Sequence, residues 1–305
     1  MCEPKEVHTP VLLKTLSGIL RYPADGTVVD ATIGYGGHAL EFGGRLTQKG
    51  LLIGLDVDNA SLAATGRKLE NLNCRVELVR ENFGRLDEVL EQSGIEQVDV
   101  ILADLGVSSG QLADAERGIS FQRDGPLDMR MDTRLQKTAA DLVNGLGQDD
   151  LANLIYQYGE ERRSRRIARG IVTARRQKPL ERTSELVKVI IRSLGITTKG
   201  RKSRIHPATR TFQALRIAVN DELGQLETLL QKAPQLLKTE GQIAIISFHS
   251  LEDRLVKYNF RENHKNGCYE ILTKKPLVAD NEERQQNPRS RSAKLRIARK
   301  VEVRQ

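Results

Sequence analysis

Several polar segments of the chain have residue types and spacing suited to binding a small charged ligand. Residues 30–38 (DATIGYGGH) join an acidic residue to a glycine-rich turn, where Gly36 and Gly37 let the backbone approach a ligand closely. Asp56 follows 20 residues after Gly36, and Asp104 lies further on in the segment ADLGVSS. A carboxylate at the position of Asp56 can accept hydrogen bonds from both hydroxyls of a ribose. These residues predict a site for a nucleoside-bearing ligand.

The glycine spacing argues against a dinucleotide. The position three residues beyond Gly36 is Ala39, so the chain lacks the third glycine of the G-x-G-x-x-G pattern. Asp30 is unfavourable beside a pyrophosphate but suits a cationic ligand, and Phe83 could cover an adenine. S-adenosylmethionine is the best chemical fit. Structural alternatives stay open here: glycines that only close a turn, a helix cap at Asp58, and a core position for Phe83.

Four short apolar runs in the first hundred residues are spaced like parallel strands separated by helices. Such alternation predicts a doubly wound α/β sheet, whose carboxyl ends bring the polar segments to one edge. The expected strands are residues 27–33, 51–56, 75–79 and 98–105, and the expected helices between them are residues 36–48, 59–71 and 86–92.

A helical insertion interrupts this pattern. From residue 111 to about 216 the chain shows helical periods only, and strand character returns at residues 241–248 after a helix over residues 211–237. The chain is therefore predicted to have a sheet domain in two parts, residues 1–110 and 216–305, around an all-α basic domain of residues 111–215 that recognises the substrate. The insert helices are expected at residues 139–143, 151–158, 167–175 and 186–194, two weaker strands at residues 268–273 and 294–301, and a polar, mobile loop at residues 278–292.

Composition narrows the class of protein. Hydrophobic residues make up 39% and charged residues 29%, which fits a globular chain, and no apolar run is long enough for a membrane span. The first apolar run lacks the basic start of a secretory signal. Cys2, Cys74 and Cys268 are odd in number and far apart, and the five histidines are scattered, so we expect no disulfide framework, no metal site and a cytoplasmic location.

The net charge of +8 conceals a segregation of charge. Residues 160–216 hold 17 basic against 4 acidic residues, and residues 284–305 hold 8 against 1, local charges of +13 and +7 that leave −12 for the remainder. An acidic body with two basic segments indicates a polyanionic partner. The alternative is a solvated helix face with a basic tail. Membrane-surface binding is disfavoured, because aromatic anchors are missing from the basic stretch.

Ten strings of sequence resemble the bacterial and organellar small-subunit ribosomal RNA cytosine-N4 methyltransferases. The resemblance runs from near residue 8 to near residue 300, and several of the strings are long and unusual. They are HTPVLL (8–13), DATIGYGGH (30–38), ADLGVSS (103–109), Gln111, DAERGISF (114–121), RDGPLDMRMD (123–132), YGEER (158–162), HPATRTFQALRI (206–217), ISFHSLED (246–253) and NPRSRS (287–292).

The resemblance implies a Rossmann-like class I methyltransferase sheet with an inserted helical domain. It also implies an enzyme that uses S-adenosyl-L-methionine to methylate a cytidine in the decoding region of 16S ribosomal RNA, with the small ribosomal subunit as partner. By matching motif, Asp56 would hold the ribose and Phe83 the adenine surroundings. The remaining residues implied to contact the cofactor are Gly36, Gly37, His38, Asp104 and Gln111.

Methyl transfer to an exocyclic amine mainly requires alignment of the amine, the methyl group and the sulfur. Asp104 is the candidate catalytic residue, and it could bind the cofactor, accept a hydrogen bond from the cytosine N4, or both; we favour the cofactor role. The Pro-Pro-aromatic clamp of many amino-methylating enzymes is absent after Asp104. His249 and Ser250 are alternative pocket residues, although a structural hydrogen-bonding role is the stronger interpretation of His249.

Two other functions compete with this interpretation. The first is an RNA-binding assembly factor with a vestigial cofactor site, which the intact glycines and acidic residues argue against. The second is a nicotinamide oxidoreductase, which the glycine spacing disfavours. The sequence leaves the oligomeric state open, with a homodimer as one alternative.

Overall fold

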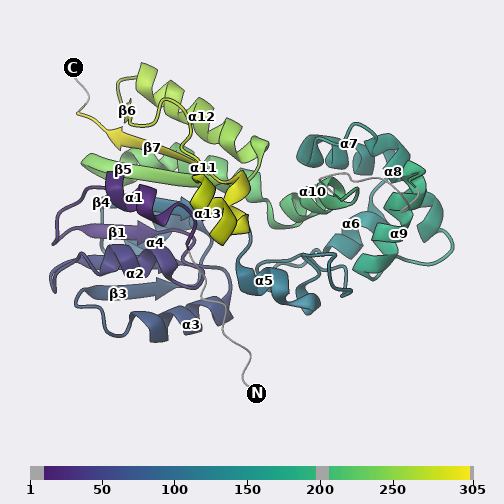
Figure 1. The fold of residues 1–305 in the computed structure, drawn as a ribbon, viewed down its shortest axis with the longest axis horizontal. Coiled ribbons are helices and arrows are strands. Elements are labelled where there is room, and N and C mark those ends of the chain that lie inside the picture. Colours follow the sequence, from purple (N-terminus) through teal and green to yellow (C-terminus); the bar gives the residue numbers. More distant parts are fainter. Residues whose placement is uncertain (1–9, 197–205, 303–305) are drawn as a thin grey trace. The chain divides into compact units, whose positions relative to one another are not determined.

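The computed structural model describes residues 10–196 and 206–302, and the chain divides into two compact units (Figure 1). The first unit joins Met1–Gly106 to Leu223–Gln305, and the second is the intervening segment Val107–Glu222. Cys2 and His8, with the start of the motif at residues 8–13, lie outside the described residues. In the described part of the chain, no helix combines the length and the apolar character that crossing a membrane requires.

A seven-stranded sheet forms the centre of the first unit, in the order β3-β2-β1-β4-β5-β7-β6. The first five strands pair in parallel, and β7 runs antiparallel to β5 and β6. This is the Rossmann-like methyltransferase sheet that was expected, and all seven predicted strands are confirmed. They are β1 (Thr27–Asp30), β2 (Leu51–Leu55), β3 (Arg75–Val79), β4 (Val98–Asp104), β5 (Leu237–Ser247), β6 (Tyr269–Ile271) and β7 (Lys294–Lys300).

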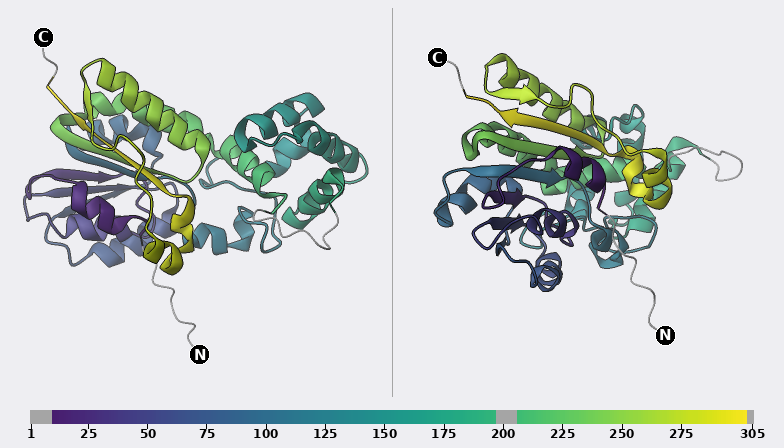
Figure 2. Two further views of the ribbon diagram at one scale, coloured as in Figure 1. Left: turned by 45° about the horizontal axis from the view of Figure 1, so that its top comes forward. Right: turned by 60° about the vertical axis from the view of Figure 1, so that its left-hand side comes forward.

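Helices cover both faces of the sheet (Figure 2). Successive strand residues point to opposite faces, so Val29 and Ile101 pack with α4, α11 and α12, whereas Val28 and Val100 pack with α1, α2 and α3. Strands that are buried on both faces are the expected result of parallel pairing. The helices of the two layers are α1 (Leu13–Ile19), α2 (Gly37–Gly43), α3 (Asn59–Leu69), α4 (Leu86–Gln92), α11 (Glu222–Leu236) and α12 (Ser250–Lys265).

The second unit is helical and has its own apolar core, which includes Ile155, Ile167 and Ile190. Three of its predicted helices begin three residues before the apolar period, at Gln148, Ser164 and Thr183. The first turn of a helix has unpaired N–H groups and favours polar residues, which an apolar period does not detect. The helices of this unit are α5 (Ser109–Ala113), α6 (Ala139–Gly145), α7 (Gln148–Gly159), α8 (Ser164–Arg175), α9 (Thr183–Leu194) and α10 (Thr209–Asn220).

The prediction of one helix over residues 211–237 is wrong. The structure has two helices, α10 and α11, separated by Asp221 in the left-handed conformation with φ of 50°. The Asn220 side chain ends α10 by a tertiary contact: it donates to the Met129 carbonyl (2.8 Å) and accepts from the Met131 N–H (2.7 Å). The apolar period continues across this break, so the pattern alone could not reveal it.

The prediction of a mobile loop over residues 278–292 is also wrong. This segment contains α13 (Asn281–Gln286) and a 3-10 turn at Pro288–Ser292. The Asp280 carboxylate accepts from the Glu283 N–H (2.8 Å) and caps α13, while the Glu283 carboxylate accepts from the Leu12 N–H (2.6 Å). A polar composition concealed an ordered segment that is held by a contact with the start of the described chain.

Candidate functional site: the carboxyl edge of the sheet

Three acidic residues lie at the carboxyl ends of neighbouring strands. Asp30 is the last residue of β1, Asp104 is the last residue of β4, and Asp56 directly follows β2. Because these strands are parallel and adjacent, their ends meet at one edge, where open α/β sheets bind their ligands. The charges of Asp30 and Asp56 interact, as do those of Asp30 and Asp104. The structure therefore brings these predicted residues together.

The glycine-rich turn between β1 and α2 is fixed by its own neighbours. Gly34 and Gly36 have φ of 50° and 70°, a conformation that residues with a side chain rarely adopt. The Gly34 N–H donates to Asp56 Oδ2 (3.0 Å), and the Thr65 hydroxyl donates to the Gly34 carbonyl (2.6 Å). Asp56 therefore holds the conformation of this turn in addition to lying at the carboxyl edge of the sheet. The sequence analysis missed Thr65, because a contact across 31 residues leaves no local pattern.

Gly36 and Gly37 also have a packing reason to be glycine. A Cβ on Gly36 would lie 2.7 Å from Thr65 Cγ2, and a Cβ on Gly37 would lie 2.4 Å from Pro10 Cγ. Both distances are shorter than any normal carbon–carbon contact, so the turn excludes side chains at these positions. Contact of the two glycines with a cofactor stays a prediction.

His38 is buried near the start of α2, and each of its ring nitrogens lies near an oxygen atom. Its Nε2 lies 2.9 Å from the Val11 carbonyl oxygen, which can only accept, so Nε2 carries the proton. Its Nδ1 lies 3.7 Å from Asp104 Oδ2, a distance longer than a hydrogen bond. The structure thus places His38 beside the carboxyl group of Asp104, with a ring orientation set by Val11.

Asp104 offers a buried oxygen that lacks a partner. Its N–H donates to the Thr32 hydroxyl (2.7 Å), whereas its Oδ1 has no hydrogen-bond partner among the described residues. Burial raises the pKa of Asp104 well above its ordinary value, and the charges of Asp30 and Glu252 raise it further, while Arg289 opposes the shift. Buried acceptors are rarely left unpaired, so Oδ1 marks the place where a ligand N–H or a positive charge fits.

Burial also perturbs the other two carboxyl groups. It raises the pKa of Asp30 to about 7 and that of Asp56 to about 6. The opposing hydrogen bonds are weaker: Asp30 accepts from the Thr32 N–H (3.3 Å), and Asp56 accepts from the N–H groups of Gly34 and Asp58. Near neutral pH, Asp30 is therefore only partly ionised, whereas Asp56 loses its charge at lower pH.

These residues fit S-adenosylmethionine, which carries a sulfonium and an ammonium group. A nearby positive charge favours the ionised form of a carboxyl group, so such a ligand would recover the charge that burial suppresses. The strand order places Asp30 between Asp56 and Asp104 along this edge. The partnerless oxygen of Asp104 is the structural observation behind this fit.

Two other predicted residues have structural partners of their own. Phe83 begins a 3-10 turn after β3 and packs, half-buried, against the core of the sheet unit. Gln111 belongs to the second unit, where its side chain accepts from the Ser108 N–H (3.1 Å) and its N–H donates to the Ser108 hydroxyl (3.2 Å). This reciprocal pair caps α5. The cofactor roles of Phe83 and Gln111 stay predictions.

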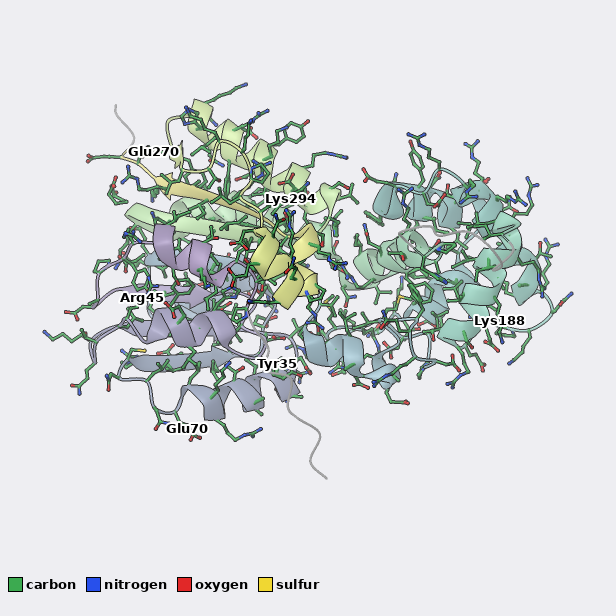
Figure 3. All side chains as sticks on the ribbon, viewed as in Figure 1. Tyr35, Arg45, Glu70, Lys188, Glu270 and Lys294 are labelled. Carbon is green, nitrogen blue, oxygen red and sulfur yellow. The ribbon has the colours of Figure 1, made fainter. Side chains whose placement is uncertain are left out.

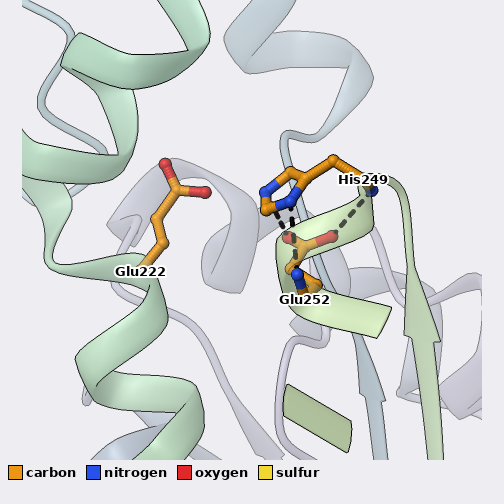
Figure 4. Close-up of side chains that lie close together, drawn as sticks. All are labelled: Glu222, His249 and Glu252. Atoms are coloured by element: carbon orange, nitrogen blue, oxygen red, sulfur yellow. Dashed lines mark hydrogen bonds and ion pairs between the residues drawn. The ribbon is translucent and has the colours of Figure 1, made fainter. Parts of the chain in front are cut away.

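His249 caps α12, as the structural interpretation of this residue expects (Figure 4). Its Nδ1 accepts from the Glu252 N–H (3.3 Å), and the Glu252 carboxylate accepts from the N–H groups of Phe248 (2.7 Å) and His249 (3.1 Å). Ser250 is the first residue of the helix. This pair fixes the junction of β5 and α12 at the carboxyl edge, and the Glu252 charge contributes to the high pKa of Asp104.

The basic residues of the second unit divide into paired and unpaired groups. Arg182 pairs with Asp124 (2.7 Å) and Arg216 with Glu222 (2.8 Å). An exposed set at α8 has no ion pair with any described residue, and Lys188 on α9 is also exposed (Figure 3). The arginines of this set, termed the α8 arginines below, are Arg162, Arg165, Arg166 and Arg169.

The second basic segment includes strand β7, whose cations form ion pairs, so the alternative of a basic tail is wrong for this strand. Lys294 and Arg296 on β7 pair with Asp253 at 3.3 and 2.7 Å, and Arg299 pairs with Glu240 (2.7 Å) and with Glu270. These pairs engage three of the eight basic residues that the sequence suggested were available to a polyanion. The α8 arginines, which have no ion pair with any described residue, are the stronger candidate.

A parallel sheet with one antiparallel strand, a glycine-rich turn after β1 and acidic strand ends fit the class of S-adenosylmethionine-dependent methyltransferases. The chain belongs to the MraW methylase family, whose model matches residues 5–301. This membership removes the nicotinamide oxidoreductase from consideration.

Curated relatives match this chain along almost its whole length. One from Acidobacterium capsulatum is 47% identical over 303 residues, which cover 97% of this chain and 99% of the relative. One from Clostridioides difficile is 43% identical over 309 residues, which cover 96% and 99%. Both carry the name ribosomal RNA small subunit methyltransferase H.

Proposed function

We propose that this protein methylates the N4 amine of one cytidine in the decoding region of 16S ribosomal RNA, with S-adenosylmethionine as methyl donor. The observation that carries the proposal is the near-complete match to relatives named as small-subunit ribosomal RNA methyltransferases. Two features of the structure support it independently. Buried carboxyl groups suit a cationic cofactor, and the α8 arginines suit a polyanionic substrate.

Methyl transfer mainly requires that the protein align the reacting groups and stabilise their charges. When bound, S-adenosylmethionine supplies a methyl group on a sulfonium, so that transfer to an amine requires in-line geometry and the loss of one amine proton. Asp30 and Asp104 would hold the cationic end of the cofactor, and Asp56 would accept from the ribose hydroxyls. Asp104 Oδ1 is also a candidate to accept a hydrogen bond from the cytosine N4 and so to favour the developing positive charge.

The helical unit is proposed to recognise the RNA. Its α8 arginines spread positive charge over a surface much larger than one nucleotide, which indicates recognition of backbone and shape. One base must then leave its stack to reach the carboxyl edge of the sheet. A substrate of this kind makes the assembled small subunit the expected partner and the cytoplasm the expected location; a homodimer is not needed for this mechanism.

The second candidate is a ribosome assembly factor with a vestigial cofactor site. The partnerless Asp104 oxygen and the unusually high pKa values at the strand ends favour an active site, because a site without a ligand gains nothing from buried acidic groups.

The test uses small subunits from a strain that lacks the enzyme, incubated with methyl-labelled S-adenosylmethionine and the purified protein. Digestion and mass spectrometry should find one labelled N4-methylcytidine, and subunits that already carry the modification should accept no label. Label on carbon 5, on a ribose oxygen or on adenine would refute the N4 assignment. Tight binding to subunits without any transfer would support the assembly factor instead.

A further inference from the structure

Helix α12 of the sheet unit carries a basic face that the sequence analysis did not detect. At 3.6 residues per turn, four cations and one tyrosine of this helix fall within about 100° of its circumference. Arg254, Arg261 and Lys265 are exposed and Lys257 is half-exposed. We call this set the α12 stripe, and its members are Arg254, Lys257, Tyr258, Arg261 and Lys265.

The fold needs only the opposite side of this helix. Val256 and Phe260 are buried against the sheet, and Phe260 contacts the Tyr269 ring edge-on with centroids 5.8 Å apart. The capping pair of His249 and Glu252 fixes the start of the helix. The stripe therefore sits on a rigid support and contributes nothing to the core, so its composition calls for another explanation.

The acidic residues of α12 leave three of the four cations in the stripe without an ion pair to a described residue. Glu252 is buried in the cap, and Asp253 pairs with Lys294 and Arg296 of β7. Glu262 lies beside the stripe, about 40° of helix rotation from Tyr258. Lys257, Arg261 and Lys265 make no ion pair with any residue that the structure describes. This charge is unusual, because the chain outside its two basic segments has a net charge of −12.

Tyr258 is an unusual residue on such a face. The chain has six tyrosines and six phenylalanines, all among the described residues, and only Tyr156 and Tyr258 are exposed. The Tyr258 side chain is 59% exposed, and the Lys257 Nζ lies 5.9 Å from the centroid of its ring. An exposed ring among cations can stack on an unpaired base while the cations contact phosphates.

We propose that the α12 stripe is a second RNA-binding surface, on the sheet unit, which contacts single-stranded RNA by stacking on Tyr258 and by phosphate contacts with the surrounding cations. The inference rests on the proposed function, since it assigns a further contact to the same ribosomal RNA substrate. A lipid surface fits less well: the apolar side of α12 is buried in the core, and Tyr258 is the one large hydrophobic residue of the helix that is exposed.

The first test removes the charge of the stripe and leaves the helix intact. Lys257→Gln, Arg261→Gln and Lys265→Gln are combined, and binding of transcribed, unmodified 16S ribosomal RNA is measured over a range of salt concentrations. We expect weaker binding and a log-affinity versus log-salt slope that is smaller by about 0.7 for each phosphate contact removed on single-stranded RNA. Affinity for S-adenosylmethionine should be unchanged, which also shows that the variant is folded.

The matched control removes three exposed charges from the other edge of the same sheet unit. Lys49→Gln, Arg67→Gln and Arg75→Gln change the net charge equally, but these residues lie near β2 and β3, whereas α12 packs beside β5, β6 and β7. The control should bind RNA nearly as the parent does. Equal weakening in both triple variants would mean that net charge alone acts, and would overturn the assignment of a local surface.

The second test addresses the ring. Tyr258→Ala should weaken binding by at least about fivefold because stacking is removed, and Tyr258→Phe should restore most of it because the ring remains. An unchanged affinity in Tyr258→Ala together with an unchanged salt slope in the triple variant overturns the inference. The inference is also overturned if the triple variant loses binding to phosphatidylserine vesicles while its RNA binding is unchanged. Methyl transfer by the parent protein is measured in parallel, so that failure of the proposed function is distinguishable from failure of this inference.

Discussion

The carboxyl edge of the sheet and the face of α8 use charge in opposite ways. Asp30, Asp56 and Asp104 are few, largely buried and raised in pKa, whereas the α8 arginines are several, exposed and unpaired. Buried charges act strongly over a short range, and exposed charges act weakly but together and are screened by salt. The first arrangement suits one small cation, and the second suits an extended polyanion.

This contrast makes the two regions experimentally separable. A change at the sheet edge should alter cofactor affinity or transfer and leave RNA binding and its salt dependence intact. A change at α8 should do the reverse.

The largest effect is expected from Asp104→Asn, which keeps the shape of the side chain and removes its charge. We expect a loss of roughly 10²- to 10³-fold in kcat/KM for methyl transfer to unmodified small subunits, the range typical for removal of one electrostatic group at a reacting centre. Thermal stability should not fall, because Oδ1 of Asp104 makes no hydrogen bond with any described residue.

Asp99→Asn is the control for this variant, since Asp99 lies at the opposite end of β4 and pairs with Lys238 (2.8 Å). It should lower stability and spare the rate. If Asp104→Asn transfers methyl groups with the kcat/KM of the parent, the charge of Asp104 is not needed at the site, and Asp30 is the remaining candidate to hold the cation.

The second prediction concerns the α8 arginines, changed together to glutamine. If each of the four arginines binds one phosphate, the salt slope for RNA binding should fall by about three, and affinity near 0.15 M salt should fall by roughly two orders of magnitude. Cofactor affinity, measured by calorimetry, should match the parent. Lys178→Gln with Arg182→Gln is the control, because both cations are already paired, with Glu185 and Asp124. If the control lowers the salt slope by the same amount per residue, then ion pairing does not decide which cations of this unit bind RNA.

These two regions also differ in how far the sequence predicted them. The strands, the glycine-rich turn and the acidic residues at the strand ends follow local patterns, because apolar runs and turn residues are local properties. The contacts of Thr32 with Asp104 and of Thr65 with Gly34 span 72 and 31 residues, so they become visible only in the fold.

Charge counts along the chain misled in two places. They indicated a second basic surface at residues 284–305, where β7 uses its cations in ion pairs with Asp253, Glu240 and Glu270. They also concealed the α12 stripe, because the three acidic residues of the same helix lower its net charge to +1 although they lie outside the stripe. Helix periodicity applied to charge, rather than to apolar residues alone, would have detected the stripe.

The third prediction returns to the sheet edge with a smaller effect. Asp56→Ala should lower affinity for S-adenosylmethionine at least about tenfold, since it removes charge-assisted hydrogen bonds to the ribose hydroxyls. Loss of the hydrogen bond from the Gly34 N–H adds to the effect by loosening the turn. Asp58→Ala is the control: Asp58 precedes α3 and accepts from the Ser61 hydroxyl (3.0 Å), so its loss should lower stability with less effect on the cofactor. If Asp56→Ala and the parent bind S-adenosylmethionine with equal affinity, Asp56 does not bind the ribose hydroxyls.

The smallest effect is a dependence of cofactor affinity on pH. Asp30 has a pKa raised to about 7 by burial, so its carboxyl group is protonated on the acidic side of neutrality and cannot attract a cation there. Affinity should therefore rise with pH and level off above pH 8; for a single group with this pKa, it falls by roughly fourfold between pH 8 and pH 6.5. Asp56, with a pKa of about 6, contributes at lower pH. Asp30→Asn should bind more weakly at pH 8 and show a flatter profile, and titration of the ligand's own amine is common to both proteins. RNA binding through arginine has no titrating group in this range and should not change. Calorimetric titration at four pH values measures the profile, and identical slopes for the parent and Asp30→Asn would show that the ionisation of Asp30 plays no part in cofactor binding.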